Sequence, residues 1–347
     1  MKRILLPLAW IYNLVTRLRN HLYNIGYRKS VRFEGVCVIG VGNLNMGGSG
    51  KTPVVEYLIR LLTPRHKVAV LSRGYGRQTM GFRVVGSQDT FRTAGDEPLQ
   101  IHKKFGSEVR VLVAEDRSLA IPQILLEFPE TEVIILDDAF QHRRVVPDLN
   151  ILLTRFDEPF HRDRIFPVGW LRESRYGARR ADVVLYTKSP EGLSAGERES
   201  LMTESRRYSG DVPVFFCRHE YGRPIPFGSA PECSKEVVLV TGIAQSAFLV
   251  NSLPKGFTLI RHFRFSDHHA FDSSEIRMIQ GYAREAGASI LTTEKDMIRL
   301  TALAETEHIA RHPWFYLPVE IVLPVGGEEF DKIAIQKIKE KIAHQGA

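Results

Sequence analysis

The feature that most constrains the fold of this chain is the glycine-rich segment 42–52, with the sequence GNLNMGGSGKT. An apolar run at 36–41 precedes it, and the sequence after it predicts a helix over 53–62. Pro53 fits the first turn of that helix, because its missing N–H would have no partner there in any case. A strand, a glycine-rich loop and a helix in this order are typical of a phosphate-binding P-loop.

The end of this segment matches the P-loop signature GxxxxGK[ST] at Gly50, Lys51 and Thr52, but Asn45 stands where the first glycine is expected. Asparagine tolerates positive φ better than other non-glycine residues. Backbone N–H groups and the helix N-terminus would hold the β- and γ-phosphates. Lys51 would neutralise negative charge, and the Thr52 hydroxyl would hold Mg²⁺. The alternative is a glycine-rich turn with an incidental lysine. The predicted nucleotide-binding residues are Asn45, Met46, Gly47, Gly48, Ser49, Gly50, Lys51 and Thr52.

A second metal ligand is expected near a P-loop, and the segment EVIILDD at 132–138 provides candidates. It is an apolar strand that ends in Asp137 and Asp138, as a Walker B element does. We expect one of the two carboxylates to orient Mg²⁺, directly or through water, and both remain candidates. The alternative is that they cap or turn the chain.

Apolar strands alternate with helices along the chain, which predicts α/β architecture with a parallel sheet covered on both faces. Helix starts are marked by capping boxes at Ser194 with Glu197 and at Asp272 with Glu275. The strands are too numerous for one compact sheet, so we expect a P-loop domain over 29–150 and a second α/β domain over 151–347. The final helix, 328–343, is a candidate to return to the first domain. The other strands are predicted at 67–72, 109–114, 133–136, 150–154, 182–187, 212–217, 237–241, 258–263, 289–292 and 315–323.

Residues 4–27 follow the spacing of an amphipathic helix. Its richest apolar run is about 12 residues long, whereas a spanning helix needs about 20. Flanking arginines, tyrosines and Trp10 suit the membrane interface, so 1–28 is predicted to associate with a membrane. The alternative is a helix that packs on the protein's own core. One face carries Ile4, Leu8, Ile11, Val15, Leu18, Leu22 and Ile25, and the other carries Asn13, Arg17, Asn20 and Asn24.

The chain of 347 residues has 47 basic and 40 acidic side chains, a formal net charge of +7. This balance fits nucleic acid, an anionic membrane surface or an acidic substrate. No basic-aromatic platform or helicase motif is present, so nucleic acid is not an expected partner. A guanine-specific switch protein would need an NKxD-like element, and neither TKSP at 187–190 nor TEKD at 293–296 matches it. A soluble small-molecule kinase would not need the N-terminal helix.

Together the motifs resemble those of the tetraacyldisaccharide 4′-kinase family, the lipid A kinases of Gram-negative bacteria. The resemblance runs in order over nearly the whole chain and includes the loop without its first glycine. The matching segments are VGNLNMGGSGKTP, SRGYGR at 72–77, GDEP at 95–98, LDDAFQHRR at 136–144, FPVGWLRE at 166–173, SDHHAF at 266–271, TTEKD at 292–296 and FYLPV at 315–319.

The resemblance implies transfer of the γ-phosphate of ATP, with Mg²⁺, to the 4′-hydroxyl of an acylated glucosamine disaccharide 1-phosphate. The product would be the 1,4′-bisphosphate, lipid IVA. It also implies a peripheral enzyme at the cytoplasmic face of the inner membrane, held to an anionic lipid surface by its helix and positive charge. No obligate protein partner is inferred.

The same resemblance implies roles for four further residues. Asp96 would accept the proton of the acceptor hydroxyl, tuned by His268, although a helix cap and a loop histidine are the alternatives. Arg172 would stabilise the transferred phosphoryl group and Glu173 would help bind Mg²⁺, unless the two form a surface ion pair. Arg73 and Arg77 either contact a substrate phosphate or shape their loop. Residues 293–296 either approach the adenine or cap a helix.

Overall fold

A computed structural model of the chain describes residues 5–244, 246–301 and 309–343. Its larger sheet has eight strands in the order β3-β4-β2-β5-β1-β6-β7-β8, all parallel to their neighbours except β3, which is antiparallel to β4. All seven residues of the central strand β1 are buried, as expected for a parallel strand covered on both faces. The strands are β1 (Cys37–Asn43), β2 (Val68–Ser72), β3 (Arg83–Val84), β4 (Arg110–Val113), β5 (Val133–Asp137), β6 (Leu149–Arg155), β7 (Val183–Thr187) and β8 (Val214–Phe216).

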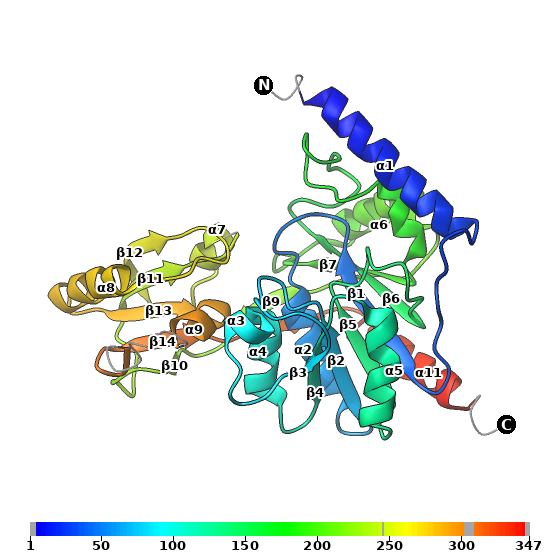
Figure 1. Cartoon of the computed structure of the whole chain (residues 1–347). Coiled ribbons are helices and arrows are strands. Elements are labelled where there is room, and N and C mark those ends of the chain that lie inside the picture. The colour runs from blue at the N-terminus through cyan, green and yellow to red at the C-terminus, as the bar shows by residue number, and fades with distance from the viewer. Residues whose placement is uncertain (1–4, 245, 302–308, 344–347) are drawn as a thin grey trace.

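Helices cover both faces of this sheet, as the sequence predicts (Figure 1). On one face lie α2 (Lys51–Leu62), α4 (Asp96–Phe105), which follows the short α3 (Phe91–Ala94), and α11 (Gly327–Ala343). On the other face lie α5 (Arg117–Glu127), the 3₁₀ helix η1 (Arg175–Arg180) and α6 (Ala195–Ser209). The capping box at Ser194 forms as predicted and starts α6. Phe330 and Ile338 of α11 join the core around β1, so the last helix does return to the first sheet.

The second sheet has five strands in the order β10-β14-β13-β11-β12, parallel apart from β10. Helix α8 (Ser273–Glu285) begins at the predicted Asp272 cap and packs Ile276 and Ile279 on one face of the sheet. Leu249 of α7 (Ser246–Asn251) packs on the other face. The strands are β10 (Ile225–Pro226), β11 (Glu236–Thr241), β12 (Thr258–Arg264), β13 (Ser289–Thr293) and β14 (Trp314–Leu317), and α9 (Glu294–Leu300) follows β13.

Two antiparallel strands, β9 (Arg218–Tyr221) and β15 (Val319–Val322), form a ribbon that carries the chain between the two sheets. The single strand predicted over 315–323 is therefore wrong, because it divides at Pro318 into β14 of the second sheet and β15 of the ribbon. Proline has no N–H to continue a ladder, which explains the break.

The predicted domain boundary near residue 150 also needs correction. Strands β6, β7 and β8 follow that point but belong to the eight-stranded sheet. The chain leaves this sheet only after β8 and comes back through β15 to α11. Pro147 and Asp148 lie just before β6, and Asp148 Oδ2 accepts a hydrogen bond from Val38 N of β1, so these residues lead the chain into the strand beside β1 and do not mark a domain boundary.

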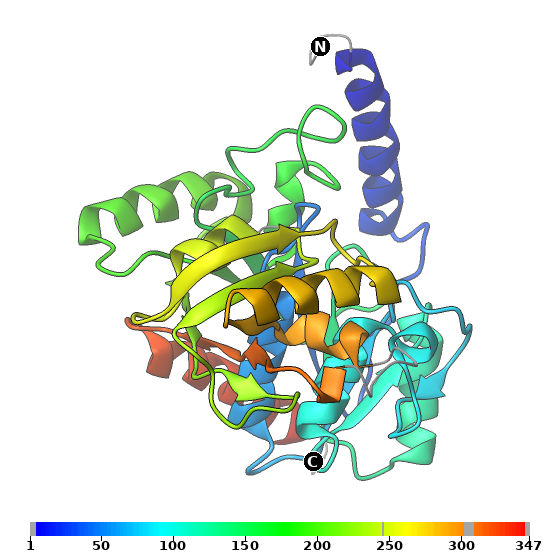
Figure 2. The ribbon, with the colours of Figure 1, turned by 90° about the vertical axis from the view of Figure 1, so that its left-hand side faces the viewer.

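Helix α1 (Leu6–Asn24) stands at one end of the molecule, beside loops of the 156–180 region (Figures 1 and 2). Its predicted apolar face points outward: Leu8, Ile11, Val15, Leu18 and Ile25 are exposed, and Ile4 lies outside the described residues. On the polar face, Asn20 contacts Glu173 and Arg143, and Asn24 contacts Arg143, so the alternative of an apolar face packed on the core is not observed. None of the helices in the described part of the chain is long and apolar enough to cross a membrane.

Candidate functional site

A cleft of about 550 Å³ lies between the two sheets, at the carboxyl ends of the strands of the larger one. Ligands of open α/β sheets bind at this edge. The phosphate loop, the ribbon, α7 and α9 all contribute to its walls. Among the predicted site residues, those that line the cleft are Met46, Gly47, Gly48, Ser49, Gly50, Lys51, Thr52, Asp138, Arg172 and His268.

The glycine-rich loop owes its shape to two glycines in the left-handed region, Gly47 at φ 104° and Gly50 at φ 77°. Gly50 is also the N-cap of α2, so the N-terminus of this 12-residue helix opens toward the cleft. Asn45 does not take a positive φ and does not line the cleft. The expectation that it replaces a glycine because asparagine tolerates positive φ is therefore wrong, as is its place among the residues that line the nucleotide site. Its side-chain amide instead donates to Asp163 Oδ2 at 2.7 Å, which ties the loop to the 163–171 segment.

Neighbouring segments hold the loop in place. Backbone bonds run from Met46 N to Trp170 O and from Arg172 N to Leu44 O, each 2.7 Å long. On the other side, Thr187 Oγ1 donates to Ser49 O at 2.8 Å and Lys188 Nζ donates to Gly48 O at 3.1 Å. The loop is therefore held between Thr187 and Lys188 at the end of β7 on one side and the segment around Arg172 on the other.

Lys51, Asp138 and Arg172 form one charged group at the floor of the cleft. Arg172 Nη1 donates to both oxygens of Asp138 at 3.0 Å, and Lys51 Nζ lies 3.6 Å from Asp138 Oδ1. Burial alone would raise the pKa of Asp138, but Lys51 and Arg172 lower it to about 2. The carboxylate is therefore charged at neutral pH and keeps both cations close to the phosphate loop.

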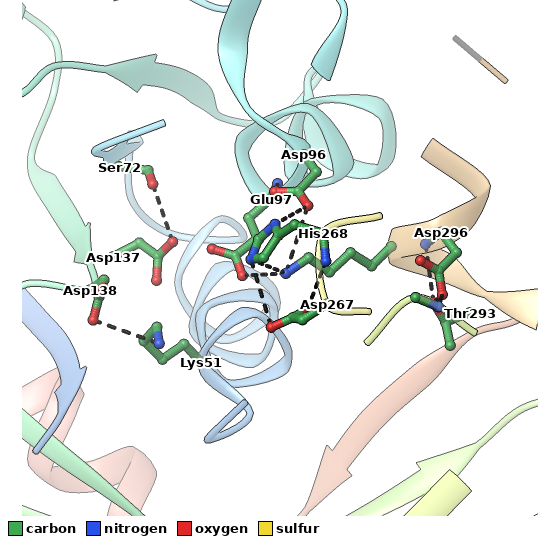
Figure 3. A network of polar contacts seen from close by, with 12 residues as sticks. Lys51, Ser72, Asp96, Glu97, Asp137, Asp138, Asp267, His268, Thr293 and Asp296 are labelled. Carbon is green, nitrogen blue, oxygen red and sulfur yellow. Dashed lines mark hydrogen bonds and ion pairs between the residues drawn. The ribbon is translucent and has the colours of Figure 1, made fainter. Parts of the chain in front are cut away.

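Asp137 is fully buried behind this group, and Ser72 Oγ donates to its Oδ2 at 3.3 Å (Figure 3). Burial, with Glu97 nearby, raises the pKa of Asp137 to about 7. Its Oδ1 has no hydrogen-bond partner among the residues that the structure describes. An orphaned carboxylate oxygen, a second carboxylate and the Thr52 hydroxyl on the cleft wall are the hard oxygen donors that Mg²⁺ prefers, so these three residues fit the ion.

Glu173 does not fit the role predicted for it. It is buried, pairs with Arg180 at 2.8 Å and accepts hydrogen bonds from Gln141 and from Asn20 of α1. It is not part of the cleft wall, and no cluster of three or more His, Cys, Asp or Glu suited to a metal occurs within the described ranges. Its neighbour Arg172 points the other way, to Asp138, so the alternative of a surface ion pair between Arg172 and Glu173 is not observed.

Asp96 and His268 lie together, as the resemblance implies, although 172 residues separate them. His268 Nδ1 is 3.0 Å from Asp96 Oδ2, and the imidazole lines the cleft while Asp96 is buried behind it (Figure 3). Asp96 is the first residue of α4, and its Oδ1 accepts from Glu97 N at 2.9 Å. The N-cap position is Gly95 and no side chain caps this end, so the alternative of Asp96 as the helix cap is not observed. His268 has a φ of 59°, a conformation that side-chain-bearing residues rarely adopt.

Two cations of α9, Lys295 and Arg299, complete this pair, and Arg299 was not indicated by the sequence. Buried Arg299 donates to Asp96 Oδ2 through Nε at 3.1 Å and through Nη2, and Lys295 Nζ lies 3.7 Å from the same oxygen. Burial would raise the pKa of Asp96, but His268, Lys295 and Arg299 together hold it below the usual range. Only Lys295, within the TTEKD motif, carried a signal in the sequence. Arg299 follows one helical turn later and looks like an ordinary helix residue.

For residues 293–296 and for Arg77, the contacts favour the structural alternatives. Thr293 is the N-cap of α9, and Asp296 bonds both Thr293 Oγ1 and Gly242 N, so this motif caps the helix. Arg77 donates to Gly81 O and Glu115 and therefore shapes its own loop.

The described geometry thus places a phosphate loop, a magnesium-compatible set of oxygens and an acid–imidazole pair in one cleft. The sequence model of the family described as tetraacyldisaccharide-1-P 4′-kinase, LpxK, matches residues 1–339. The chain belongs to this family.

Relatives support the same assignment. The tetraacyldisaccharide 4′-kinase of Cytophaga hutchinsonii is 37% identical over 325 residues, covering 92% of this chain and 91% of the relative. That of Bacteroides thetaiotaomicron is 38% identical over 356 residues, covering 97% and 93%. A crystal structure of LpxK from Aquifex aeolicus in complex with ATP superposes with a TM-score of 0.76 at 30% identity, covering 97% of this chain and 99% of that one. The fold described above is therefore the LpxK fold.

Proposed function

We propose that this protein transfers the γ-phosphate of ATP to the 4′-hydroxyl of a tetraacylated glucosamine disaccharide 1-phosphate, which yields the 1,4′-bisphosphate precursor of lipid A. The observation that carries the proposal is the shared cleft, in which His268 of the Asp96–His268 pair and Lys51 of the phosphate loop face the same space. A nucleotide switch needs the phosphate loop but has no use for a second, acceptor-side pair.

In the proposed reaction the 4′-oxygen attacks the γ-phosphorus and the bond to the ADP oxygen breaks. The hydroxyl proton passes to the Asp96–His268 pair. His268 is the member that lines the cleft, whereas both oxygens of Asp96 are engaged by its neighbours, so the imidazole would contact the hydroxyl and Asp96 would hold it. Lys51 and Arg172 would stabilise charge on the transferred group, which is most of what phosphoryl transfer needs.

Thr52, Asp137 and Asp138 would hold Mg²⁺, which neutralises phosphate charge and orients the nucleotide when bound. Asp137 supplies an oxygen with no described partner, and Asp138 stays charged beside two cations. Glu173 is left out of this set, because its carboxylate is already paired with Arg180.

The protein is further proposed to act at the cytoplasmic face of the inner membrane, where α1 lies in the lipid interface. An apolar helix face that points away from the protein, next to the exposed Trp170 and Phe166 of the adjoining loop, supports this placement. The net charge of +7 favours an anionic surface.

The proposal is tested by incubating the purified protein with ³²P-labelled ATP, Mg²⁺ and the disaccharide 1-phosphate in detergent micelles. The expected product is a labelled lipid from which a phosphatase specific for the 4′-position releases the label as inorganic phosphate. Nucleotide hydrolysis without labelled lipid would instead favour a switch or ATPase. A soluble sugar acceptor that is phosphorylated as fast as the lipid would favour a small-molecule kinase.

A further inference from the structure

Three charged side chains from three different helices meet beside the cleft and have no role in the reaction described so far. They are Glu56 of α2, Lys104 of α4 and Glu294 of α9. Lys104 Nζ lies 2.7 Å from Glu56 Oε2 and 2.9 Å from Glu294 Oε1, so one ammonium joins two carboxylates. The group is defined here as the Glu56–Lys104–Glu294 junction.

We propose that Lys104 is a positioning residue for phosphoryl transfer, which through this junction sets the phosphate loop against the Asp96–His268 pair. Lys104 does not line the cleft, so it would act only through the two carboxylates. Transfer needs the phosphate and the hydroxyl in close register, and a misplacement of about 1 Å can cost about 10²-fold in rate. The inference rests on the proposed kinase reaction and adds a residue to it.

The junction is connected to both halves of the site by short stretches of chain. Glu56 follows Lys51 on α2 by roughly one and a half helical turns. Glu294 directly precedes Lys295, whose Nζ lies 3.7 Å from Asp96 Oδ2. Helix α9 follows a strand of the second sheet and packs on α4, which covers the first (Figure 1). A shift of α9 relative to α2 would therefore move the cations around Asp96 relative to Lys51.

Burial makes the two carboxylates depend on their cation. Glu56 is 1% exposed and Glu294 is 5% exposed, where an unpaired charge is costly. Gln100 Nε2 donates to Glu56 Oε1 at 2.9 Å, and Lys104 occupies Oε2. Oε2 of Glu294 has no hydrogen-bond partner among the residues that the structure describes, so this carboxylate is compensated through Oε1 by Lys104.

The charges of the two carboxylates oppose each other across the contact between the domains. Burial raises the pKa of Glu56; Lys104 counteracts this rise and Glu294 adds to it. Burial alone would lower the pKa of Lys104, but Glu56 and Glu294 raise it above its usual value, so the side chain is cationic at neutral pH. Without the ammonium, the two carboxylates would repel each other and push α9 away from α2.

A second cation, Arg60, lies near Glu56 but serves another contact. Arg60 Nη2 is 3.6 Å from Glu56 Oε2 and only 2.8 Å from Glu320 Oε1 of β15. The ring of Phe105 lies close to both cations, with its centre 5.2 Å from Arg60 Cζ and 5.9 Å from Lys104 Nζ. Arg60 therefore fastens α2 to the ribbon, whereas Lys104 fastens it to α9.

The first test compares kcat of Lys104 variants in the lipid kinase assay at saturating ATP and lipid. Lys104→Met should lower kcat by about 10–100-fold, because the loop and the acceptor pair lose their register. Lys104→Arg keeps a cation that can bridge two carboxylates and should stay within about threefold of wild type. Lys103→Met is the matched control: this neighbouring exposed lysine reaches Thr301, and its loss should change kcat by less than about twofold.

A double variant separates charge repulsion from loss of packing. In Lys104→Met with Glu294→Gln the repulsion is gone and the new amide can donate to Glu56, so kcat should recover to within about fivefold of wild type. Hydrogen exchange of the α9 amides, measured by mass spectrometry without lipid, should be at least about fivefold faster in Lys104→Met and return toward wild type in the double variant.

Three results would overturn the proposal. Wild-type kcat and exchange in Lys104→Met would show that the junction positions nothing, and equal losses in the single and double variants would mean that Lys104 only fills space. If Lys104→Met does not fold, a folded double variant with kcat more than about tenfold below wild type would contradict it as well. A wild-type protein that makes no labelled lipid would instead contradict the kinase proposal, and the exchange data would decide separately whether the junction holds α9.

Discussion

The guanidinium of Arg299 donates to the same oxygen of Asp96 that contacts His268, although 203 residues separate the arginine from the aspartate. Both side chains are almost fully buried. Arg299 also donates to Asp296 and to Gly242 O, so it joins α9 and the second sheet to the start of α4. The acid–imidazole pair is thus assembled by contact between the two domains.

Replacement of Arg299 by Met should reduce both stability and turnover. Removing one partner of a buried ion pair leaves the other charge uncompensated, which destabilises by about 3–5 kcal/mol. His268 would also lose the neighbour that fixes Asp96. Urea unfolding and the lipid kinase assay measure the two effects. Arg284→Met, at an exposed position of α8, should change stability by less than about 0.5 kcal/mol. Wild-type stability in Arg299→Met would contradict a stabilising role of the Arg299–Asp96 ion pair.

The lowered pKa of Asp96 predicts an acid-dependent contribution to stability. A carboxyl group whose folded-state pKa lies below its unfolded value of about 3.9 stabilises the fold above that value. This contribution is lost as the pH falls through the lower, folded-state pKa. The difference in unfolding free energy between wild type and Asp96→Asn should therefore be largest near pH 7 and shrink below about pH 4. A difference that is constant with pH would show that Asp96 does not titrate as described.

The positions of Asp96 and His268 predict that both are needed for turnover. His268→Ala and Asp96→Ala should each lower kcat by about 10²–10⁴-fold, the usual range for a lost general base. ADP affinity should be retained, because neither residue contacts the phosphate loop. Lys51→Ala, by contrast, should weaken both ADP binding and turnover. If His268→Ala keeps near-normal kcat while Asp96→Ala does not, the carboxylate contacts the hydroxyl and the proposed order within the pair is reversed.

Glu173→Gln should leave the Mg²⁺ requirement of the reaction unchanged, since Glu173 is paired with Arg180 and lies outside the cleft wall. The substitution should instead lower the free energy of unfolding by about 1–3 kcal/mol, because Arg180 loses a buried charged partner. Asp138→Asn is the comparison and should raise the Mg²⁺ concentration needed for half-maximal rate. A similar shift in Glu173→Gln would restore it as a metal ligand.

The outward apolar face of α1 predicts lipid binding. Replacing Leu8, Leu14 and Leu18 with Ser should weaken sedimentation with anionic liposomes at least about tenfold, because each leucine contributes roughly 1.5–3 kcal/mol when fully buried. The melting temperature should hardly change, as all three side chains are exposed in the free protein. Leu119 and Leu126, exposed leucines of α5, form the control pair, and their change to Ser should leave sedimentation unaltered. Unchanged sedimentation of the α1 variant would remove the helix as the lipid contact.

Local features of the fold could be read from the sequence. The strand, loop and helix around Lys51, the buried strand that ends in Asp137 and Asp138, and the caps at Ser194 and Asp272 all depend on residues a few positions apart. Backbone propensity, side-chain capping and apolar patterning act over that range, so these elements were predicted nearly to their observed ends. The Asp96–His268 pair was predicted only from the resemblance of the ordered motifs to those of the family.

The contacts between segments that lie far apart in the sequence were decided only by the tertiary structure. Strands β6, β7 and β8 extend the first sheet outward from β1 instead of joining the second sheet, and Arg299 meets Asp96 only because α9 packs on α4. Glu173 faces Arg180 and Asn20 instead of the cleft, and α1 turns its polar side to the protein. The sequence by itself determined which segments are strands, helices and phosphate-binding loop, since those preferences are local. Which charged side chains pair depends on long-range packing. A buried charge can be satisfied by any suitably placed partner, and only the packing of the sheets decides which partner is near.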